Sequence, residues 1–172
     1  VLLDWGTLTG SIEQIGFSKS AGVKYSLLKN ADDDVLFLFY DNGSGWQQID
    51  ITPLNLTTAG LYTALGKTIL YSPDFGALIV SEATLTPLSV GFGVEKIIQY
   101  KDEWYLVSVA DESNNRSIAK TADFNTITFF GYAILPSVDN PAEFKERLFI
   151  GKTDTFVGDM RSFYNIDVYS QA

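Results

Sequence analysis

The strongest constraint on the fold is a series of short apolar or alternating segments separated by turn residues. Residues 35–40 (VLFLFY) form an apolar run between the acidic trio 32–34 and the turn 41–43, which is typical of a buried strand. Residues 46–51 (WQQIDI) alternate between apolar and polar side chains, which is typical of a half-exposed strand. We therefore expect a fold built from short strands.

The rest of the chain continues this pattern. Helical signals occur only at residues 140–147, where Asn140 could cap a short helical turn with Pro141 at its first position. The 14 glycines fall mostly between the apolar segments, as tight turns require. An all-β sandwich, barrel or propeller is the expected fold class. Further strands are predicted at residues 23–28, 61–65, 68–71, 77–80, 96–100, 104–109, 117–120, 127–132, 148–151 and 163–169.

Composition narrows the chemistry that the chain can perform. It contains no histidine and no cysteine, which excludes imidazole catalysis, Ser-His-Asp and Cys-His triads, disulfides and thiolate metal sites. The net charge of −9 disfavours nucleic acid as a partner. No apolar run of about 18 residues occurs, so we expect no membrane insertion. These features favour recognition over catalysis, with no cofactor and no metal.

Three segments share a turn pattern. Asp41, Asp74 and Asp123 each follow an apolar segment and precede a Gly or Asn two residues later, with a large apolar residue beyond. An aspartate can cap its own turn by accepting backbone N–H bonds, and Gly or Asn tolerates positive φ. This pattern resembles the Asp-box turn of sialidase-type β-propellers, and residues 96–129 resemble one propeller blade. The resemblance implies three or four blades of a propeller in the 172 residues.

The competing fold is a jelly-roll sandwich. Residues 156–172 resemble the closing strand of laminin-G and concanavalin-like lectin domains, with a Gly-x-Met start and a late Val-Tyr pair. The first half of the chain carries no comparable lectin pattern. Both alternatives are all-β and stay open at this point.

The first residues suggest a biological setting. Residues 5–14 (WGTLTGSIEQ) resemble a short module of bacteriophage tail-fibre and other phage structural proteins, which joins a stalk to a terminal domain. The resemblance implies a linker at residues 1–16 and a single all-β domain at 17–172. It also implies a homotrimer in the virion or another extracellular setting, which binds a host surface receptor such as a glycan. The start without Met suggests a fragment or processed product.

The polar loop 111–116 is the predicted recognition loop, because it is long for a hairpin and lacks core-forming residues. Asn114, Asn115 and Arg116 would supply hydrogen bonds to a ligand, and Trp104 and Tyr105 would offer flat rings for sugar faces. Asp41, Asp74 and Asp123 are predicted to be structural.

Two other functions stay open. A glycoside hydrolase fragment would need two facing carboxylates, and candidates such as Asp102, Glu103 and Asp111 lie in predicted turns, where aspartate is common for conformational reasons. A ligand-free structural virion protein would need no site. Residues 32–34 could in principle bind Ca²⁺, but an acidic strand edge is the simpler interpretation.

Overall fold

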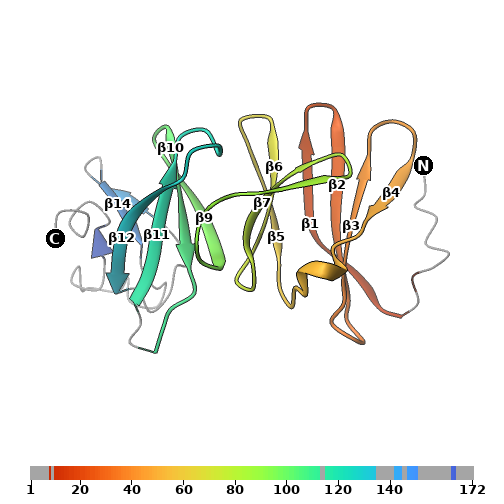
Figure 1. Cartoon of the computed structure of the whole chain (residues 1–172), viewed down its shortest axis with the longest axis horizontal. Coiled ribbons are helices and arrows are strands. Elements are labelled where there is room, and N and C mark those ends of the chain that lie inside the picture. The colour runs from red at the N-terminus through yellow and green to blue at the C-terminus, as the bar shows by residue number, and fades with distance from the viewer. Residues whose placement is uncertain are drawn as a thin grey trace. The chain divides into compact units, whose positions relative to one another are not determined.

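The computed structural model describes residues 8, 10–112, 115–134, 142–144, 147–150 and 164–165, with side chains through Gly131. The described strands form antiparallel sheets, and none of these sheets closes into a barrel (Figure 1). The expectation of an all-β fold is therefore confirmed.

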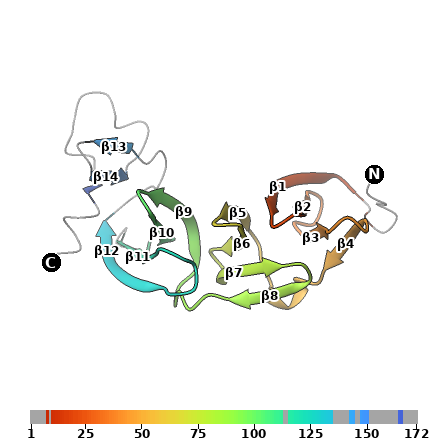
Figure 2. The same ribbon diagram turned by 90° about the horizontal axis from the view of Figure 1, so that it is seen from above.

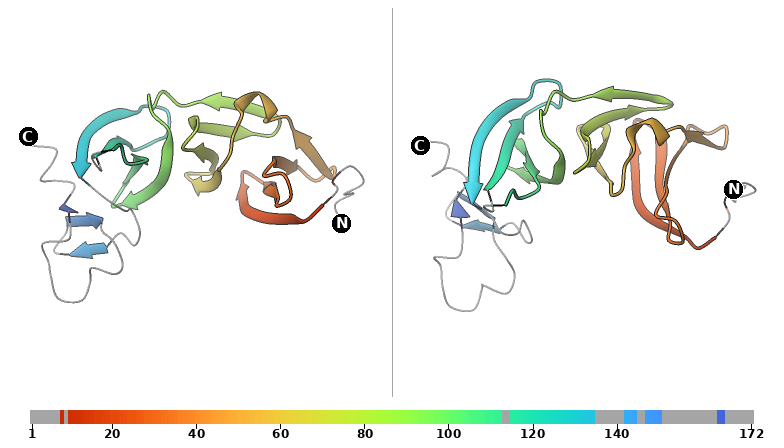
Figure 3. Two further views of the ribbon diagram at one scale, coloured as in Figure 1. Left: turned by 90° about the horizontal axis from the view of Figure 1, so that it is seen from below. Right: turned by 60° about the horizontal axis from the view of Figure 1, so that its bottom comes forward.

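Each sheet is a meander whose strands lie side by side in chain order. Sheet A contains β1 (Ile12–Ser20), β2 (Val23–Asn30), β3 (Leu36–Asp41) and β4 (Trp46–Ile49). Sheet B contains β5 (Gly60–Ala64), β6 (Lys67–Ser72), β7 (Gly76–Ser81) and β8 (Thr84–Pro87). Sheet C contains β9 (Val94–Tyr100), β10 (Glu103–Ser108), β11 (Asn115–Thr121) and β12 (Thr128–Ile134). Sheet D contains β13 (Ala142–Phe144), β14 (Arg147–Ile150) and β15 (Tyr164–Asn165). A 3₁₀ turn, η1 (Thr52–Leu54), lies on the connection between sheets A and B (Figure 3).

Sheets A, B and C begin with the same kind of hairpin. Two residues join the first strand to the second in each sheet: Ala21-Gly22, Leu65-Gly66 and Lys101-Asp102. In the first two hairpins both residues have positive φ, with 49° and 84° at Ala21-Gly22 and 51° and 68° at Leu65-Gly66. This combination defines the type I′ turn, whose twist matches that of the flanking strands.

The chain divides into two compact units, residues 1–89 and residues 90–172. In the first unit, sheets A and B share one apolar core, and β1 lies beside β5 and β6 (Figure 2). Sheet A supplies Leu27 and Leu38, and sheet B supplies Leu70 and Leu78, all at most 2% exposed. Burial of such side chains contributes about 1.5–3 kcal/mol each, which makes this core the main source of stability in the unit.

A buried hydroxyl cluster fixes how β1 meets sheet B. Ser18 Oγ lies 2.6 Å from both Thr63 Oγ1 and Thr68 Oγ1, and Ser20 Oγ lies 2.7 Å from Thr68 Oγ1. Thr68 is fully buried, so its hydroxyl depends on these partners in place of water. The cluster therefore favours one register between β1 and sheet B.

In the second unit, the second strand of sheet C, β10, is buried on both faces. Trp104, Tyr105, Leu106 and Val107 are each at most 6% exposed. The Trp104 ring packs against Phe124 with centroids 5.3 Å apart, and the Tyr105 ring meets Phe130 edge-on at 5.4 Å. A continuous apolar strand of this kind belongs to a sheet covered on both sides.

The jelly-roll alternative requires Greek-key connections between strands that are not neighbours in the chain. In the described sheets every strand pairs with its neighbour in sequence, so these sheets do not have jelly-roll topology. Four-stranded meanders are compatible with propeller blades. The lectin-like pattern at residues 156–172 lies outside the described residues apart from β15.

Two sequence expectations differ from the structure, and two edge strands, β1 and β8, were not predicted. The linker boundary predicted at residue 16 falls inside β1, because residues 12–14 and 16 already pair with β2. The helical turn predicted at residues 140–147 is wrong, since residues 142–144 and 147 belong to β13 and β14, which pair with each other. β8 was not predicted, because it has only four residues and contains a proline, which strands accept mainly at a sheet edge. Of the leader motif at residues 5–14, residues 5–7 and 9 lie outside the described residues.

Candidate ligand-recognition site

Asp41 caps its own turn between β3 and β4. Its Oδ1 accepts the backbone N–H groups of Gly43 at 2.8 Å and Gly45 at 3.2 Å, and Lys24 lies 3.4 Å from Oδ2. These contacts, with the Gly43 N–H first, hold the pKa of the Asp41 carboxyl below its ordinary value. Trp46, expected to plug this turn, is half-buried and lies outside the shared core of the first unit.

Asp74 accepts hydrogen bonds from a segment outside its own turn, the connection between η1 and β5. Its Oδ2 accepts the backbone N–H and the hydroxyl of Thr57, both at 2.7 Å, and the N–H of Thr58 at 3.4 Å. Ser72 completes the contact by donating its hydroxyl to the Thr58 carbonyl at 2.6 Å. The Thr57 backbone and hydroxyl donors lower the pKa of Asp74. The carboxylate thus anchors the link between sheets A and B.

Asp123 caps the turn between β11 and β12 in the second unit. Its Oδ1 accepts the N–H groups of Asn125 and Thr126, both at 2.8 Å. Phe124 adopts a positive φ of 57° and is completely buried against Trp104. Here the apolar plug of the turn is the residue directly after the aspartate.

The three aspartates do not occupy equivalent places. Asp41 and Asp123 lie in the connection between the third and fourth strands of their sheets, whereas Asp74 lies between the second and third strands. The three aspartates therefore do not mark one repeated position in the sheets. The repeat that the sheets do share is the two-residue hairpin between their first and second strands.

The loop predicted for recognition is closed by its own first residue. Asp111 Oδ1 accepts the Asn115 N–H at 2.8 Å, and the Asp111 N–H donates to the Asn115 carbonyl at 2.9 Å. Arg116 is 5% exposed; its guanidinium pairs with Glu95 and donates to the Ser108 carbonyl at 2.6 Å. Asn114 lies outside the described residues.

Three of the predicted ligand-binding side chains are therefore internal. Arg116 clamps the start of β11 to β9 and β10, and the Trp104 and Tyr105 rings lie within the packing of sheet C. The Trp104 indole N–H is buried and meets no acceptor among the described residues. The expectation that these rings face a ligand needs correction, because a strand covered on both faces has no exposed side.

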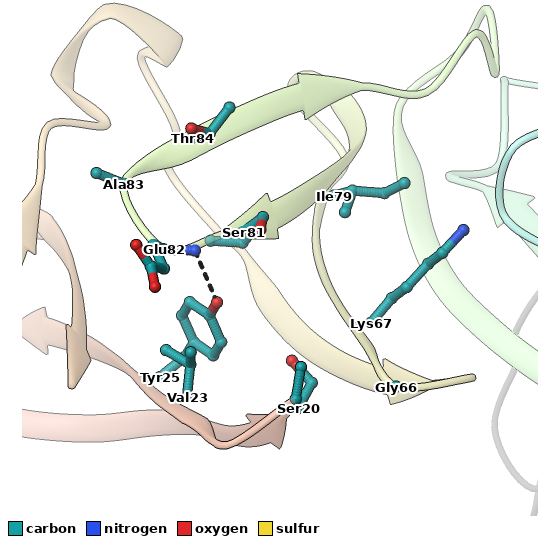
Figure 4. Close-up of a pocket in the computed structure, with 12 residues that line it drawn as sticks. Ser20, Val23, Tyr25, Gly66, Lys67, Ile79, Ser81, Glu82, Ala83 and Thr84 are labelled. Carbon is teal, nitrogen blue, oxygen red and sulfur yellow. Dashed lines mark hydrogen bonds between the residues drawn. The ribbon is translucent and has the colours of Figure 1, made fainter. Parts of the chain in front are cut away.

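A groove in the first unit brings together residues that no local sequence motif connects (Figure 4). It has a volume of about 600 Å³, opens to solvent and lies where the β1–β2, β5–β6 and β7–β8 turns meet. Pockets of about 300–1,000 Å³ are the usual size for small-molecule sites. The lining residues are Ser20, Ala21, Val23, Tyr25, Gly66, Lys67, Ile79, Val80, Ser81, Glu82, Ala83 and Thr84.

Tyr25 organises the groove. Its side chain rises from β2 toward the β7–β8 turn, and its hydroxyl accepts the Glu82 backbone N–H at 2.9 Å (Figure 4). Burial raises the pKa of the phenol above 10.0, so the hydroxyl keeps its proton at neutral pH. Among the described residues this proton has no acceptor, which leaves it for a ligand. Ser20 and Lys67 lie to one side of the ring and the Glu82 carboxylate to the other.

The groove escaped prediction because Tyr25 and Glu82 are 57 residues apart and meet only through packing of sheet A on sheet B. The backbone of the β7–β8 turn gives a weak indication of the groove. Glu82 has a φ of 48°, and a non-glycine residue held in this conformation often marks a constrained position.

Two smaller hollows contain carboxylates that have partners within the chain. One of about 240 Å³ beside β11 contains Glu103 and Asp123. Glu103 pairs with Lys120 at 2.9 Å, and Asp123 Oδ1 caps its turn. Within the described part of the chain no three acidic side chains gather as metal ligands do, and no helix is long and apolar enough to cross a membrane.

No protein-family model matches this chain, and no curated protein was found to be similar to it.

Proposed function

We propose that this chain is a non-catalytic recognition domain that binds a glycan in the groove between sheets A and B. The observation that carries the proposal is the buried Tyr25 hydroxyl, held at the groove by the Glu82 N–H with its own proton still available. A fixed, protonated donor at the floor of an open groove suits a ligand rich in hydroxyl oxygens.

The remaining lining supports an uncharged polar ligand. Ser81 and Thr84 add exposed hydroxyl groups, while Val23 and Ile79 add apolar surface for the C–H faces of a sugar ring. Lys67 and Glu82 balance each other, so the groove lacks the strongly acidic character of a chain with net charge −9. A neutral oligosaccharide therefore fits this chemistry better than an anionic or a strongly cationic ligand.

The number of carboxylates in the groove supports binding without hydrolysis. Glycoside hydrolysis uses two carboxyl groups that face each other across the bond to be broken. The groove lining contains a single carboxylate, Glu82, and the chain has no histidine that could replace the second. This supports a binding role over the alternative of a glycosidase fragment.

The setting that we propose is the receptor-binding part of a phage tail fibre or another virion appendage. The support is the leader resemblance at residues 5–14 and the three meander sheets that each begin with a two-residue hairpin. Sheets of this kind can serve as blades of a β-propeller, and we propose that fold for the complete assembly. The ligand would then be a glycan on the surface of a host cell.

A matched pair of tyrosine variants tests the proposal. The protein is titrated by calorimetry with neutral oligosaccharides prepared from bacterial surface polysaccharides. Tyr25→Phe removes the groove hydroxyl and should weaken binding about tenfold, since one lost hydrogen bond to a ligand is worth about 1–1.5 kcal/mol. Tyr40→Phe is the control, because the Tyr40 hydroxyl donates to Gln47 at 2.9 Å and does not line the groove.

The outcomes separate the functions. Equal affinity of wild type and Tyr25→Phe would remove the groove from the binding site. Release of new reducing ends from the oligosaccharides would favour the alternative of a glycoside hydrolase. Loss of this release in Glu82→Gln would then identify Glu82 as the catalytic acid. Absence of binding across the panel would favour a ligand-free structural role.

A further inference from the structure

The turn between β3 and β4 contains the pair Asn42-Gly43, and no other asparagine of the chain is followed by glycine. Both residues are exposed. Apart from its chain neighbours, no atom lies within 4 Å of the point where a Gly43 side chain would begin. Gly43 has a φ of 102°, which glycine adopts without strain. The Gly43 nitrogen therefore has no side chain beside it that could keep a neighbouring group away.

The Asn42 side chain folds back over this glycine. Its Oδ1 accepts the Ser44 N–H at 3.3 Å, which closes an Asx-turn around the Gly43 peptide. The small ring closed by this hydrogen bond contains both the Asn42 amide carbon and the Gly43 nitrogen, so the two atoms lie close together. The same bond draws electron density from the Asn42 side-chain carbonyl, which makes its carbon easier to attack.

Asp41 holds the proton of the Gly43 nitrogen. Its Oδ1 accepts the Gly43 N–H at 2.8 Å and the Gly45 N–H at 3.2 Å. These bonds, with the Gly43 N–H first, lower the pKa of the Asp41 carboxyl, so this group is ionised at neutral pH. A carboxylate of low pKa is too weak a base to remove an amide proton. It instead stabilises the protonated nitrogen through a charge-assisted hydrogen bond.

We propose that Asn42 is a site of spontaneous backbone modification whose rate is set by Asp41. Hydroxide removes the Gly43 amide proton, and the nitrogen attacks the Asn42 amide carbon. The new C–N bond closes a five-membered succinimide ring while the side-chain nitrogen leaves as ammonia, taking a proton from water and so returning the hydroxide. Water then opens the ring at either carbonyl, which leaves aspartate or isoaspartate at position 42. One water thus replaces one ammonia.

The modification undoes the cap around it. Isoaspartate carries one extra carbon in the main chain, which displaces the Gly43 N–H from Asp41 Oδ1. Either product also adds a negative charge beside Asp41, whose own charge is balanced by Lys24 at 3.4 Å. The β3–β4 turn is therefore less stable after the modification. This turn does not line the groove, so the inference is independent of the proposed function.

Asn30 provides a comparison within the same chain. Its Oδ1 accepts the Asp32 N–H at 3.0 Å, which is the same kind of turn. Asn30, however, is 7% exposed and precedes Ala31. The alanine methyl group crowds the nitrogen that would attack, and burial keeps hydroxide away. Asn30 should therefore stay unmodified while Asn42 reacts.

Incubation of the full chain at mildly alkaline pH, followed by peptide mass spectrometry, tests the proposal. The peptide with residue 42 should gain the mass difference between OH and NH₂ and separate into two products, while the peptide with Asn30 keeps its mass. Asp41→Asn should speed the change about fivefold, because a neutral acceptor holds the Gly43 N–H about half as strongly as a carboxylate. Asn42→Gln should abolish it, since glutamine must close a larger ring.

The matched control is Asp123→Asn, because Asp123 caps its own turn with N–H bonds of 2.8 Å in the second unit. It should leave the rate at Asn42 unchanged. The free peptide of residues 39–46 sets the time scale. An unchanged mass at Asn42 once this peptide is fully converted, a faster change at Asn30, or equal rates in wild type, Asp41→Asn and Asp123→Asn would each overturn the proposal. Circular dichroism before incubation shows that both aspartate variants are folded.

Discussion

At the scale of single residues, aspartate carboxylates hold the chain in place between strands. Asp41 and Asp123 cap their own turns, and Asp74 binds Thr57 and Thr58 on the link between sheets A and B. In each case an ionised carboxylate accepts backbone N–H groups that would otherwise face solvent. The pKa of Asp41 and that of Asp74 are lowered for this reason, so both groups stabilise the folded state while they are ionised.

The first prediction concerns acid stability. A lowered folded-state pKa means that the contribution of Asp74 is complete above the ordinary value of 3.8 and is lost as pH falls through the folded-state pKa. Asp74→Asn should therefore reduce the free energy of unfolding at neutral pH, and the gap to wild type should close below pH 3.8. Urea denaturation across this pH range measures the gap. Thr57→Val, which removes one donor, should give a smaller gap, and parallel curves would contradict the assignment.

The second prediction concerns the buried plug of the third aspartate turn. Phe124→Ala should lower the free energy of unfolding by about 3–5 kcal/mol, because it empties a fully buried site beside Trp104. Tryptophan fluorescence should shift to longer wavelength as water reaches the indole. Phe129→Ala serves as the control, since an exposed phenylalanine should change stability by about 0.5 kcal/mol or less. Equal losses from the two variants would show that Phe124 is not a core residue.

The positions of the turns could be predicted from the sequence, but the burial of individual side chains could not. The residue types at Asp41, Asp74 and Asp123 are sufficient to predict strand connections, because their preferences are local. The burial of Trp104, Tyr105 and Arg116 depends on what covers each face of sheet C, which local pattern does not contain. For this reason the local pattern predicts ligand binding at Trp104, Tyr105 and Arg116, although these three side chains are internal.

At the scale of elements, the two-residue hairpins set the register of each sheet. Leu65 has a φ of 51° and is 56% exposed, so a branched apolar side chain occupies a position that favours Asn or Gly. The strained residue contributes no core contact in return. The β5–β6 turn is therefore a place where the natural sequence is less stable than it could be.

The third prediction follows from this turn. Leu65→Asn creates an Asn-Gly pair with Gly66 and should raise the free energy of unfolding by about 0.5–1 kcal/mol. Leu65→Val at the same position should lower it, because a β-branched side chain tolerates positive φ poorly. Thermal denaturation of both variants measures the difference. A higher melting temperature for Leu65→Val than for Leu65→Asn would contradict the turn assignment.

Strand existence was predictable where apolar residues dominate, as in β3 and β10, and unpredictable where polar residues form an edge. β1 and β8 lie at sheet edges and carry serine, threonine, lysine or glutamate, so their strand character comes from pairing with a neighbour. At residues 140–147 the capping signals of Asn140 and Pro141 predicted a helical turn, but strand pairing between β13 and β14 prevails. Tertiary pairing overrides a short local preference in such cases.

At the scale of the whole molecule, the candidate binding site is the groove of about 600 Å³ in the first unit. The groove joins residues far apart in sequence, such as Ser20, Tyr25 and Glu82, through the packing of sheets A and B. We propose that this groove recognises a glycan.

The most direct test of the central claim is a two-dimensional amide NMR titration of the full chain with neutral surface oligosaccharides. We predict that shift changes concentrate at Ser20, Gly66, Lys67, Ser81 and Glu82, which line the groove, while the oligosaccharides keep their length. Shift changes confined to the loop at residues 111–116, or shortened oligosaccharides, would contradict the claim that this groove recognises a glycan without cleaving it.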